Sequence, residues 1–279
     1  MRIEKLRFLD SGINNGYFNM ALDEVLSNKV SENLSEPVLR FYQWDPACLS
    51  LGYFQKTELE IDFDGLKKHN VDLVRRQTGG RAVLHDHELT YSIILPLDIE
   101  GIGLSINESY KIISQGLLLG LQKLGLKPIL QKPLEKAVPH TSSACFDAPS
   151  SYELLCNNKK IIGSAQKRFT KVLLQHGSIP LTMDVNKLFD CLIFENDDRK
   201  KLMKRYFSMK ATSIFEVAQK EFPMDYIKEC FLEGFKEAFS ANIEYSELSE
   251  EEIIETSGMM TAKYSTDQWN ILKNKQKSL

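Results

Sequence analysis

The sequence lacks the segments that attach a protein to a membrane or direct it to export. Its apolar runs fall well short of the roughly 18 residues that a membrane span needs. The N-terminus, Met1-Arg2-Ile3-Glu4-Lys5, mixes charged with apolar residues and has neither the apolar core nor the cleavage site of a signal peptide. The chain has 279 residues, of which 43% are hydrophobic, and can bury a substantial core. We therefore expect a soluble, cytoplasmic protein with no membrane partner.

Cysteines are few, and their pattern argues against two kinds of site. They are odd in number, widely scattered and free of any C-x-x-C pair, which argues against a disulfide framework and a zinc site. The five are Cys48, Cys145, Cys156, Cys191 and Cys230. Free thiols in a reducing compartment fit this pattern better. The formal net charge of −3 gives no global attraction to nucleic acid, which we do not expect as a partner.

Positive charge gathers in one stretch despite the acidic balance of the chain. Its cationic residues are Arg199, Lys200, Lys201, Lys204, Arg205 and Lys210. A solvated helix face is the simpler interpretation of such a run. The alternative is a docking patch for an acidic carrier protein, and the sequence leaves both open.

Helices are expected near the start of the chain, in its middle and throughout its last third. Asn19 can cap a helix whose first turn carries Asp23. Ser105 and Glu108 form a capping-box pattern ahead of an apolar helical series that Gly125 closes. Later segments with helical patterns are 186–191, 214–220 and 226–239, followed by short polar segments at 250–254 and 264–271.

Strands should occupy most of the remaining apolar runs. These runs are 38–42, 48–53, 71–76, 82–84, 89–95 and 172–181. The first two should be neighbouring strands on either side of Asp45-Pro46, and the next three should form a meander bent by Gly79-Gly80. Asn157-Asn158 predicts a hairpin between 152–156 and 160–168, because asparagine tolerates the positive φ of a two-residue turn.

These elements predict the α+β class, with a mixed β-sheet flanked by helices and a helical C-terminal portion. The chain contains no internal repeat and no low-complexity linker. A single domain over residues 1–279 is the simplest description. Within it we expect a catalytic core of about 33–248 and a short C-terminal extension, 249–279.

Cys145 stands in a setting unlike that of a core cysteine. Its neighbours include Ser143 and Asp147, whereas Cys48 and Cys156 lie among apolar residues. Lys160 follows on an expected strand. If an ammonium lowered the thiol pKa by about two units, the thiolate would gain about 2.7 kcal/mol. A lysine so placed could also accept a proton from an attacking amine. The pair therefore suggests acyl transfer, with an inert thiol as the alternative.

The segment from Arg75 to Arg81 combines adjacent arginines with two glycines. Neighbouring residues on a strand point to opposite faces, so one of Arg75 and Arg76 should point inward, where a guanidinium needs a carboxylate, a carbonyl or a ligand. Gly79 and Gly80 permit close approach of the backbone to a bound group. The phosphate-loop patterns GxxxxGK[ST] and GxGxxG are both absent. A structural β-bulge is an equally good interpretation.

The histidines offer weaker indications. His85 and His87 would share one face of a strand and could bind a metal, but no further ligand cluster accompanies them and a turn is expected there. His176, in Gln175-His176-Gly177, is interpreted first as a hydrogen-bonded structural histidine.

Four motifs together resemble the lipoate-protein ligase and biotin-protein ligase superfamily. They are R-R-Q-T-G-G-R-A-V-L-H-D (75–86), A-C-F-D-A-P-S (144–150), K-I-I-G-S-A-Q (160–166) and L-Q-H-G-S-I (174–179). The second and fourth look most like the LipM-type branch, the octanoyltransferases of lipoate biosynthesis. The similarity extends over nearly the whole chain, from Asp10-Ser11-Gly12 to Lys263-Tyr264.

The resemblance implies a mechanism as well as a fold. Cys145 matches the family's acyl-accepting cysteine and Lys160 its lysine, and no metal, nucleotide or other cofactor takes part. Octanoate would pass from octanoyl-acyl carrier protein to Cys145 as a thioester. The lysine of a lipoyl domain, typically glycine cleavage H protein, would then take it in a ping-pong reaction. The substrate-binding positions that we expect are Arg76, Gly79, Gly80, His85, Gly163, Ser164 and His176.

Three other functions remain possible within this resemblance. An ATP-dependent lipoate-protein ligase needs no cysteine and usually carries a third glycine where this chain has Arg81. An octanoyl-H-protein amidotransferase uses a cysteine in a Cys-Pro-Gly-like context that this chain lacks. An inert lipoyl-domain binding module would keep the fold but lose the pair of Cys145 and Lys160.

Overall fold

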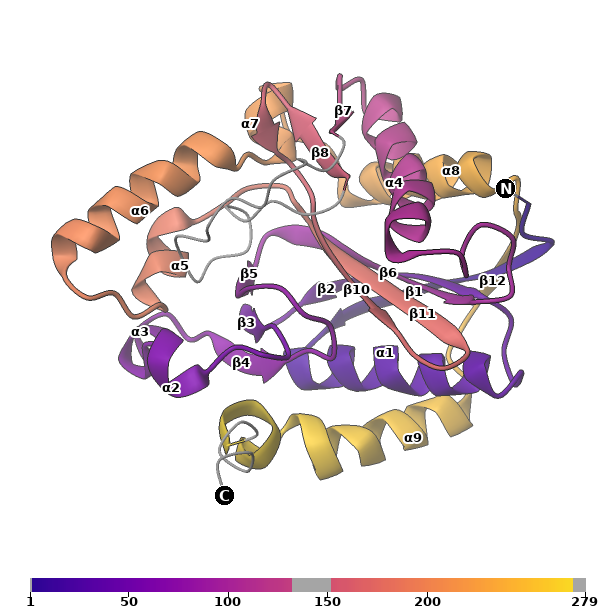
Figure 1. Cartoon of the computed structure of the whole chain (residues 1–279), viewed down its shortest axis with the longest axis horizontal. Helices are drawn as coiled ribbons and strands as arrows, with labels where there is room; N and C mark the ends of the chain where they lie inside the picture. Colours follow the sequence, from indigo (N-terminus) through magenta and orange to yellow (C-terminus); the bar gives the residue numbers. More distant parts are fainter. Residues whose placement is uncertain (1, 132–151, 273–279) are drawn as a thin grey trace.

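The computed structural model describes residues 2–131 and 152–272, and it confirms the α+β class. A mixed six-stranded sheet with the strand order β10-β11-β6-β2-β1-β12 crosses the centre of the molecule (Figure 1). Strand β1 is parallel to both of its neighbours, and the other pairs are antiparallel. The strands are β1 (Lys5–Asn14), β2 (Val38–Trp44), β6 (Glu88–Pro96), β10 (Gly163–Arg168), β11 (Val172–Pro180) and β12 (Asn242–Ser246).

Helices cover both faces of this sheet. Helices α4 (Ile106–Lys123) and α8 (Met224–Phe239) lie on one face, and α1 (Gly16–Ser31) lies on the other, with α9 (Glu250–Met259) packed outside it (Figure 1). Successive side chains of a strand alternate between faces. In β6, Leu89, Tyr91, Ile93 and Leu95 therefore join the core under α4 and α8, whereas Thr90 and Ser92 face α1. The face toward α1 is mixed, because it also carries a smaller apolar cluster that includes Ile94.

Two three-stranded sheets complete the fold. The first, in the order β4-β3-β5, contains β3 (Cys48–Leu51), β4 (Asp72–Arg75) and β5 (Val83–His85). The second contains β7 (Ile129–Gln131), β8 (Glu153–Cys156) and β9 (Lys159–Lys160). The remaining helical segments are α2 (Thr57–Glu60), α3 (Phe63–Lys68), α5 (Val185–Asp190), α6 (Asp197–Lys210), α7 (Ile214–Ala218) and two π-helical turns, Met260–Tyr264 and Gln268–Leu272. Among the residues described, no helix is long and apolar enough to cross a membrane.

The predicted neighbours β2 and β3 belong to different sheets, so that prediction is wrong. Both edges of β2 are already paired, with β1 and with β6, and no edge remains for β3. The predicted meander is also wrong. Strand β4 pairs with β3 in parallel through the crossover formed by α2 and α3, β5 pairs with the opposite edge of β3, and β6 joins the large sheet.

Two other local signals placed their elements correctly. Ser105 caps α4 by accepting a hydrogen bond from the Glu108 amide, and the hairpin turn has positive φ at Asn157 and Asn158. The first helix, however, is capped by Asn15 rather than by the predicted Asn19. The predicted strand 160–168 is divided between β9 and β10, and β1 and β12 were not predicted.

Helices α4 and α8 cross closely because glycines line their contact. A methyl group added to Gly234 would lie 2.5 Å from the backbone carbonyl oxygen of Gly116 and 2.5 Å from the backbone nitrogen of Gly120. Neither is the mobile end of a side chain, so the helices would have to separate. This contact holds the apolar layer against the sheet face opposite the polar residues.

We expect Gly234→Ala to lower the free energy of unfolding by about 1–3 kcal/mol, because it overpacks a backbone contact. Gly258→Ala is the matched control. Gly258 lies on exposed α9 with no atom within 4 Å of the added methyl, and alanine is the better helix former by about 0.5–1 kcal/mol. Urea unfolding of both variants measures these changes in stability. Equal unfolding midpoints for Gly234→Ala and Gly258→Ala would contradict the close contact between α4 and α8.

Candidate functional site

Two rows of polar side chains run across the sheet on the face toward α1. The strand register sets His176 opposite Ser92 and Ser92 opposite Arg40. Two residues further along, the register sets Ser178 opposite Thr90 and Thr90 opposite Tyr42. All six side chains are buried. A buried layer of this kind needs fixed hydrogen-bond partners, and two carboxylates provide them.

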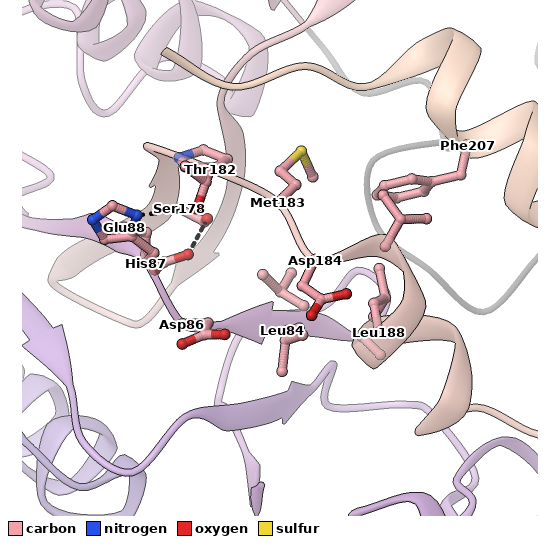
Figure 2. A pocket seen from close by; sticks show the side chains of 14 residues that line it. Leu84, Asp86, His87, Glu88, Ser178, Thr182, Met183, Asp184, Leu188 and Phe207 are labelled. Atoms are coloured by element: carbon pink, nitrogen blue, oxygen red, sulfur yellow. Dashed lines mark hydrogen bonds between the residues drawn. The ribbon is translucent and has the colours of Figure 1, made fainter. Parts of the chain in front are cut away.

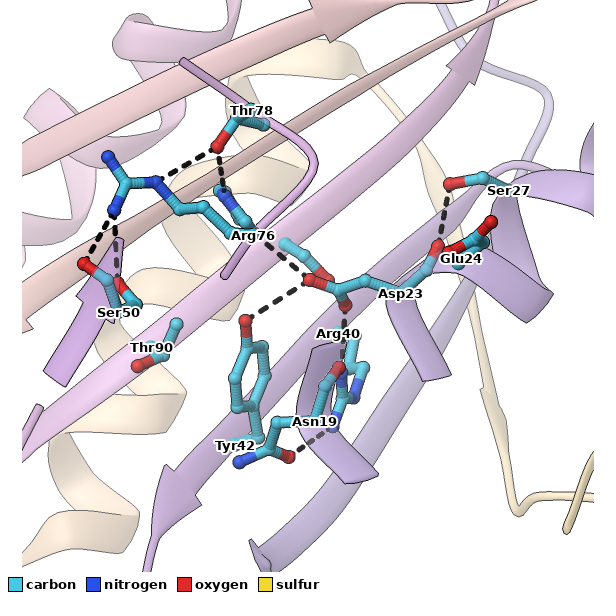
Figure 3. A network of polar contacts seen from close by, with 12 residues as sticks. Asn19, Asp23, Glu24, Ser27, Arg40, Tyr42, Ser50, Arg76, Thr78 and Thr90 are labelled. Atoms are coloured by element: carbon cyan, nitrogen blue, oxygen red, sulfur yellow. Dashed lines mark hydrogen bonds and ion pairs between the residues drawn. The ribbon is translucent and has the colours of Figure 1, made fainter. Parts of the chain in front are cut away.

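Asp23, on α1, organises the first row. Its carboxylate accepts hydrogen bonds from Arg40 Nη1 and Ser92 Oγ, both at 2.8 Å, and pairs with His176 Nδ1 at 3.1 Å (Figure 3). Burial by itself raises the pKa of Asp23, but the His176 hydrogen bond and the charge of Arg40 outweigh it and lower that pKa below its usual value. Burial lowers the pKa of His176. A neutral His176 therefore donates from Nδ1 to an ionised Asp23.

Glu88 organises the second row and a second histidine. Its carboxylate accepts hydrogen bonds from the hydroxyl groups of Thr90 and Ser178. His85 Nδ1 lies 2.7 Å from the same carboxylate, and the imidazole stacks on the Trp44 ring at a centroid distance of 4.0 Å. His85 is thus held on one side by an acid and on its face by an indole.

Arg76 joins the two histidines through a pair of hydroxyl groups. Its Nε donates to Thr78 Oγ1, which lies 2.7 Å from His176 Nε2. Its Nη1 donates to Ser50 Oγ (Figure 3). The same hydroxyl oxygen lies 2.8 Å from His85 Nε2. Each histidine therefore has a carboxylate at Nδ1 and a hydroxyl at Nε2, and both hydroxyls meet one guanidinium. The arrangement occupies both nitrogens of His85, in place of the metal considered from the sequence, and the described residues contain no cluster fit for a metal ion.

Arg75 and Arg76 are both buried, although the sequence predicted that only one of them would point inward. Arg76 donates further to the carbonyl groups of Gly79 and Arg81. Arg75 donates to the carbonyl groups of Gly52 and of other residues, including two in the C-terminal π-helical turn. Backbone carbonyls and hydroxyl groups thus accept hydrogen bonds from both guanidinium groups.

A cavity of about 350 Å³ opens on the face of the sheet toward α1. Five of the predicted substrate-binding residues line it, namely Arg76, His85, Gly163, Ser164 and His176. Met20, Trp44 and Val83 add apolar surface. The structure therefore brings together residues from three of the four sequence motifs.

Gly79 and Gly80 lie beside this cavity rather than in its lining. Gly80 has a φ of 93°, and its carbonyl oxygen would be only 2.0 Å from a methyl group on Gly52. The close approach predicted for a ligand is thus made by the chain itself, and it holds the loop against the turn after β3. The β-bulge considered as an alternative is not needed to explain either glycine.

A second cavity has a volume of about 470 Å³ (Figure 2). It adjoins the first, because Val83 and Ser178 line both. Leu84, Leu188 and Phe207 give it apolar walls, and it extends toward α6. His87, whose Nδ1 lies 3.0 Å from Thr182 Oγ1, stands at its edge. The two cavities share part of their lining, and both expose mainly apolar surface.

The predicted catalytic pair is described only in part. Cys145 lies outside the described residues. Lys160, on β9, is buried, and its Nζ lies 2.9 Å from Glu153 Oε1 on the neighbouring strand. Lys160 is absent from the lining of both cavities, but its backbone carbonyl accepts a hydrogen bond from the Thr212 amide, just beyond α6.

The other four cysteines are buried, as expected for Cys48, Cys156 and Cys191. Burial raises the pKa of all four, to about 11 for Cys156 and Cys191. Thiols with such pKa values are poor nucleophiles at neutral pH, because almost none of the thiolate is present.

Sequence reasoning missed the residues that order the site. Asp23 was interpreted as a partner of the helix dipole, and Glu88 was not singled out. The only available signal was a set of polar residues inside otherwise apolar strands, such as Thr90 and Ser92 in β6. Such residues indicate a buried polar layer, but not which carboxylate meets them.

The fold and the site define a member of a known family. Residues 15–236 match the lipoyl protein ligase A/B catalytic domain, and the chain belongs to this family. A protein named octanoyltransferase LipM from Bacillus subtilis (strain 168) is 44% identical over 275 residues, covering 97% of this chain and 99% of that protein. A second protein named octanoyltransferase LipM, from Staphylococcus aureus, is 43% identical over 275 residues, which again cover 97% of this chain and 99% of that protein. These matches confirm the resemblance found in the sequence.

Solved structures agree on the fold. A bipartite lipoate protein ligase from Thermoplasma acidophilum has a TM-score of 0.79 at 23% identity and covers 96% of each chain. Lipoate-protein ligase A bound with ATP has a TM-score of 0.77 at 24% identity, covering 96% of this chain and 98% of that one. At such identities the likeness concerns the fold alone.

The buried His176 should make the protein less stable in mild acid. Its folded pKa lies below the usual 6.5, so between these two values the unfolded chain binds a proton that the folded chain does not. The free energy of unfolding should therefore fall as the pH drops below about 6.5, by at most about 1.4 kcal/mol per pH unit.

Urea unfolding between pH 7.5 and 5.5 measures this slope. His176→Gln removes the titrating ring and should flatten the slope, although its stability at pH 7.5 will be lower. His87→Gln, at an exposed position, should keep the wild-type slope. If the free energy of unfolding of His176→Gln falls with pH as steeply as that of the wild type, His176 is not the group that causes the loss of stability in acid.

Proposed function

We propose that this protein is a cytoplasmic octanoyltransferase of lipoate biosynthesis, which moves octanoate from octanoyl-acyl carrier protein to the lysine of a lipoyl domain. The observation that carries the proposal is the 44% identity, over nearly its whole length, to a protein named octanoyltransferase LipM. The acceptor in this reaction is typically glycine cleavage H protein. Neither a metal nor another cofactor takes part in the chemistry proposed.

The nucleophile that we propose is Cys145. The four other cysteines are buried thiols with raised pKa values, so they are poor candidates. In the first step the Cys145 thiolate attacks the octanoyl carbonyl, and the carrier leaves as its thiolate. In the second step the lipoyl-domain amine attacks the Cys145 thioester, loses its proton, and releases the thiolate. The product is an octanoyl-lysine amide.

Lys160 is the residue that we propose for handling charge and protons. Its ion pair with Glu153 fixes the position of the ammonium at the end of a short strand, where the side chain is almost fully buried. A fixed ammonium near the nucleophile would favour the thiolate over the thiol. When the acceptor amine attacks, Lys160 would relay its proton away.

The two adjoining cavities suit an acyl chain with a reactive end. The seven carbons beyond the octanoyl carbonyl are worth roughly 5–6 kcal/mol when buried, at about 0.8 kcal/mol each. We propose that Arg76, His85 and His176 form a rigid polar wall at the carbonyl end. Backbone amides near Gly163 would stabilise the negative charge that develops on the carbonyl oxygen.

An ATP-dependent lipoate-protein ligase is the second candidate, because a structure of that fold is bound with ATP. That protein is 24% identical to this chain, so the likeness concerns the fold alone. The two functions differ in one requirement that can be tested directly, which is ATP for activation of the free acid.

We expect wild-type protein incubated with octanoyl-acyl carrier protein, without ATP, to gain the mass of one octanoyl group. Cys145→Ala and Cys145→Ser should fold normally, gain no mass and transfer no octanoate. Cys230→Ala is the control and should keep the adduct, because its thiol is buried with a raised pKa. Intact mass spectrometry gives the readout, and an adduct that persists in Cys145→Ala would rule out this nucleophile.

The charge of Lys160 and its proton transfer can be separated by two substitutions. Lys160→Met should shift alkylation of Cys145 by iodoacetamide toward the free-thiol pKa of about 8.5, and should also slow transfer to the lipoyl domain. Lys160→Arg should keep the low pKa of the Cys145 thiol, so that iodoacetamide still alkylates it at the wild-type pH. The same variant should slow octanoyl transfer from a preformed acyl-enzyme, because a guanidinium does not lose its proton. If Lys160→Met alkylates with the wild-type pH profile, the two side chains are not in contact.

A further inference from the structure

Helix α6 is strongly basic in an acidic chain. Its fourteen residues carry six cationic and two acidic side chains, a net charge of +4, whereas the chain as a whole has −3. Two of these cationic side chains have partners on α5: Lys200 forms an ion pair with Asp190 at 2.7 Å, and Lys204 contacts Asn186. These two therefore have structural partners.

The outward face of α6 combines charge with exposed apolar side chains. At 100° per residue, Lys201, Leu202, Arg205 and Met209 project opposite the buried Met203 and Phe207. Leu202 and Met209 are each 55% exposed. The nearest acid to Lys201 is Asp198, at 3.7 Å with both side chains in solvent, and Arg205 forms no ion pair with any residue that the structure describes. This face thus offers two cations and two apolar side chains to a partner.

The same helix is attached to the proposed reaction centre from its inner side. Phe207 lines the second cavity, which adjoins the histidine-lined one (Figure 2). Ala211, just after the helix, forms a β-bridge with Lys160, and the Thr212 amide donates to the Lys160 carbonyl at 2.9 Å. A protein bound outside α6 would therefore be one helix away from Lys160.

From this placement we propose that the outer face of α6 is the docking surface for the acidic carrier protein that brings the octanoyl group. The inference rests on the proposed function and names the surface that serves its first step. An acidic partner complements Lys201 and Arg205, and an apolar side chain of that partner would pack against Leu202 and Met209.

The donor fits this surface better than the acceptor does. A carrier protein holds its acyl group on a long, flexible thioester arm, which can pass around a helix about 10–12 Å in diameter. The acceptor lysine has only a four-carbon stem and must be placed directly over the reacting carbonyl. The lipoyl domain therefore binds elsewhere, closer to the thioester.

The test compares two double charge reversals that change the net charge equally. Lys201→Glu/Arg205→Glu alters the α6 face, and Arg2→Glu/Lys127→Glu alters exposed positions away from it. Adduct formation is measured with octanoyl-acyl carrier protein and with octanoyl-pantetheine, which lacks the protein. Binding of the carrier protein to each surface variant is measured separately in the Cys145→Ala background, which requires no chemistry.

With the carrier protein as donor, Lys201→Glu/Arg205→Glu should lose about tenfold or more in kcat/KM at low salt, and added salt should narrow the difference from wild type. With octanoyl-pantetheine its rate should stay within about twofold of wild type. Carrier binding should weaken about tenfold or more as well. The control pair should behave as wild type in each assay.

Unchanged carrier binding in Lys201→Glu/Arg205→Glu would overturn the docking surface, whatever happens to the chemistry. A missing adduct in the wild type with both donors would overturn the proposed function, while weakened carrier binding would still support the surface. Slower transfer from preformed octanoyl-enzyme to the lipoyl domain, with normal loading, would assign this face to the acceptor and refute the proposal.

Discussion

The buried carboxylate of Asp23 is the contact on which the arrangement of the site depends. It is the point at which α1 meets three strands of the central sheet, through Arg40 on β2, Ser92 on β6 and His176 on β11. Removing one partner from such a pair leaves a buried charge uncompensated, at a typical cost of about 3–5 kcal/mol. The same carboxylate fixes the tautomer of His176, and through Thr78 the position of Arg76. Stability and site geometry therefore depend on one side chain.

The period of two along each strand allows the core and the site to share the same strands. In β6, Leu89, Tyr91 and Ile93 pack under α4 and α8, while Thr90 and Ser92 order the histidines. A shift of register by one residue would exchange the two sets and bury the polar groups in the apolar core. Pairing of β6 on both edges, with β2 and with β11, prevents this shift.

Features set by neighbouring residues could be predicted from the sequence, and features set by distant ones could not. Ser105 at the start of α4 and Asn157-Asn158 in the hairpin act within a few residues, and both were predicted. The separation of β2 from β3 depends on which edges other strands have already taken, which no local pattern reveals.

The residues of the site also fall into those that a local motif predicts and those that depend on distant parts of the chain. Arg76, His85 and His176 were predicted because motifs carry them, and they line one cavity. Asp23 and Glu88 were not predicted as parts of it, because their partners come from other elements. Asp23 on α1 meets side chains of the sheet, and Glu88 on β6 meets His85 on β5 and Ser178 on β11. The burial of both arginines is a related case. Alternation along a strand gives opposite faces to Arg75 and Arg76, but it does not show that each face is covered by other parts of the chain.

Arg75 also has a consequence for the order in which the molecule can be completed. Its guanidinium donates to the backbone carbonyls of Trp269 and Asn270, and the Trp269 indole donates back to the Arg75 carbonyl. Until a ribosome has released residues 269 and 270, this buried cation lacks part of its set of acceptors. Its neighbour Arg76 links the two histidines of the site. A nascent chain can therefore pair the strands of the central sheet, the last of which ends at Ser246, before it can complete the burial of Arg75.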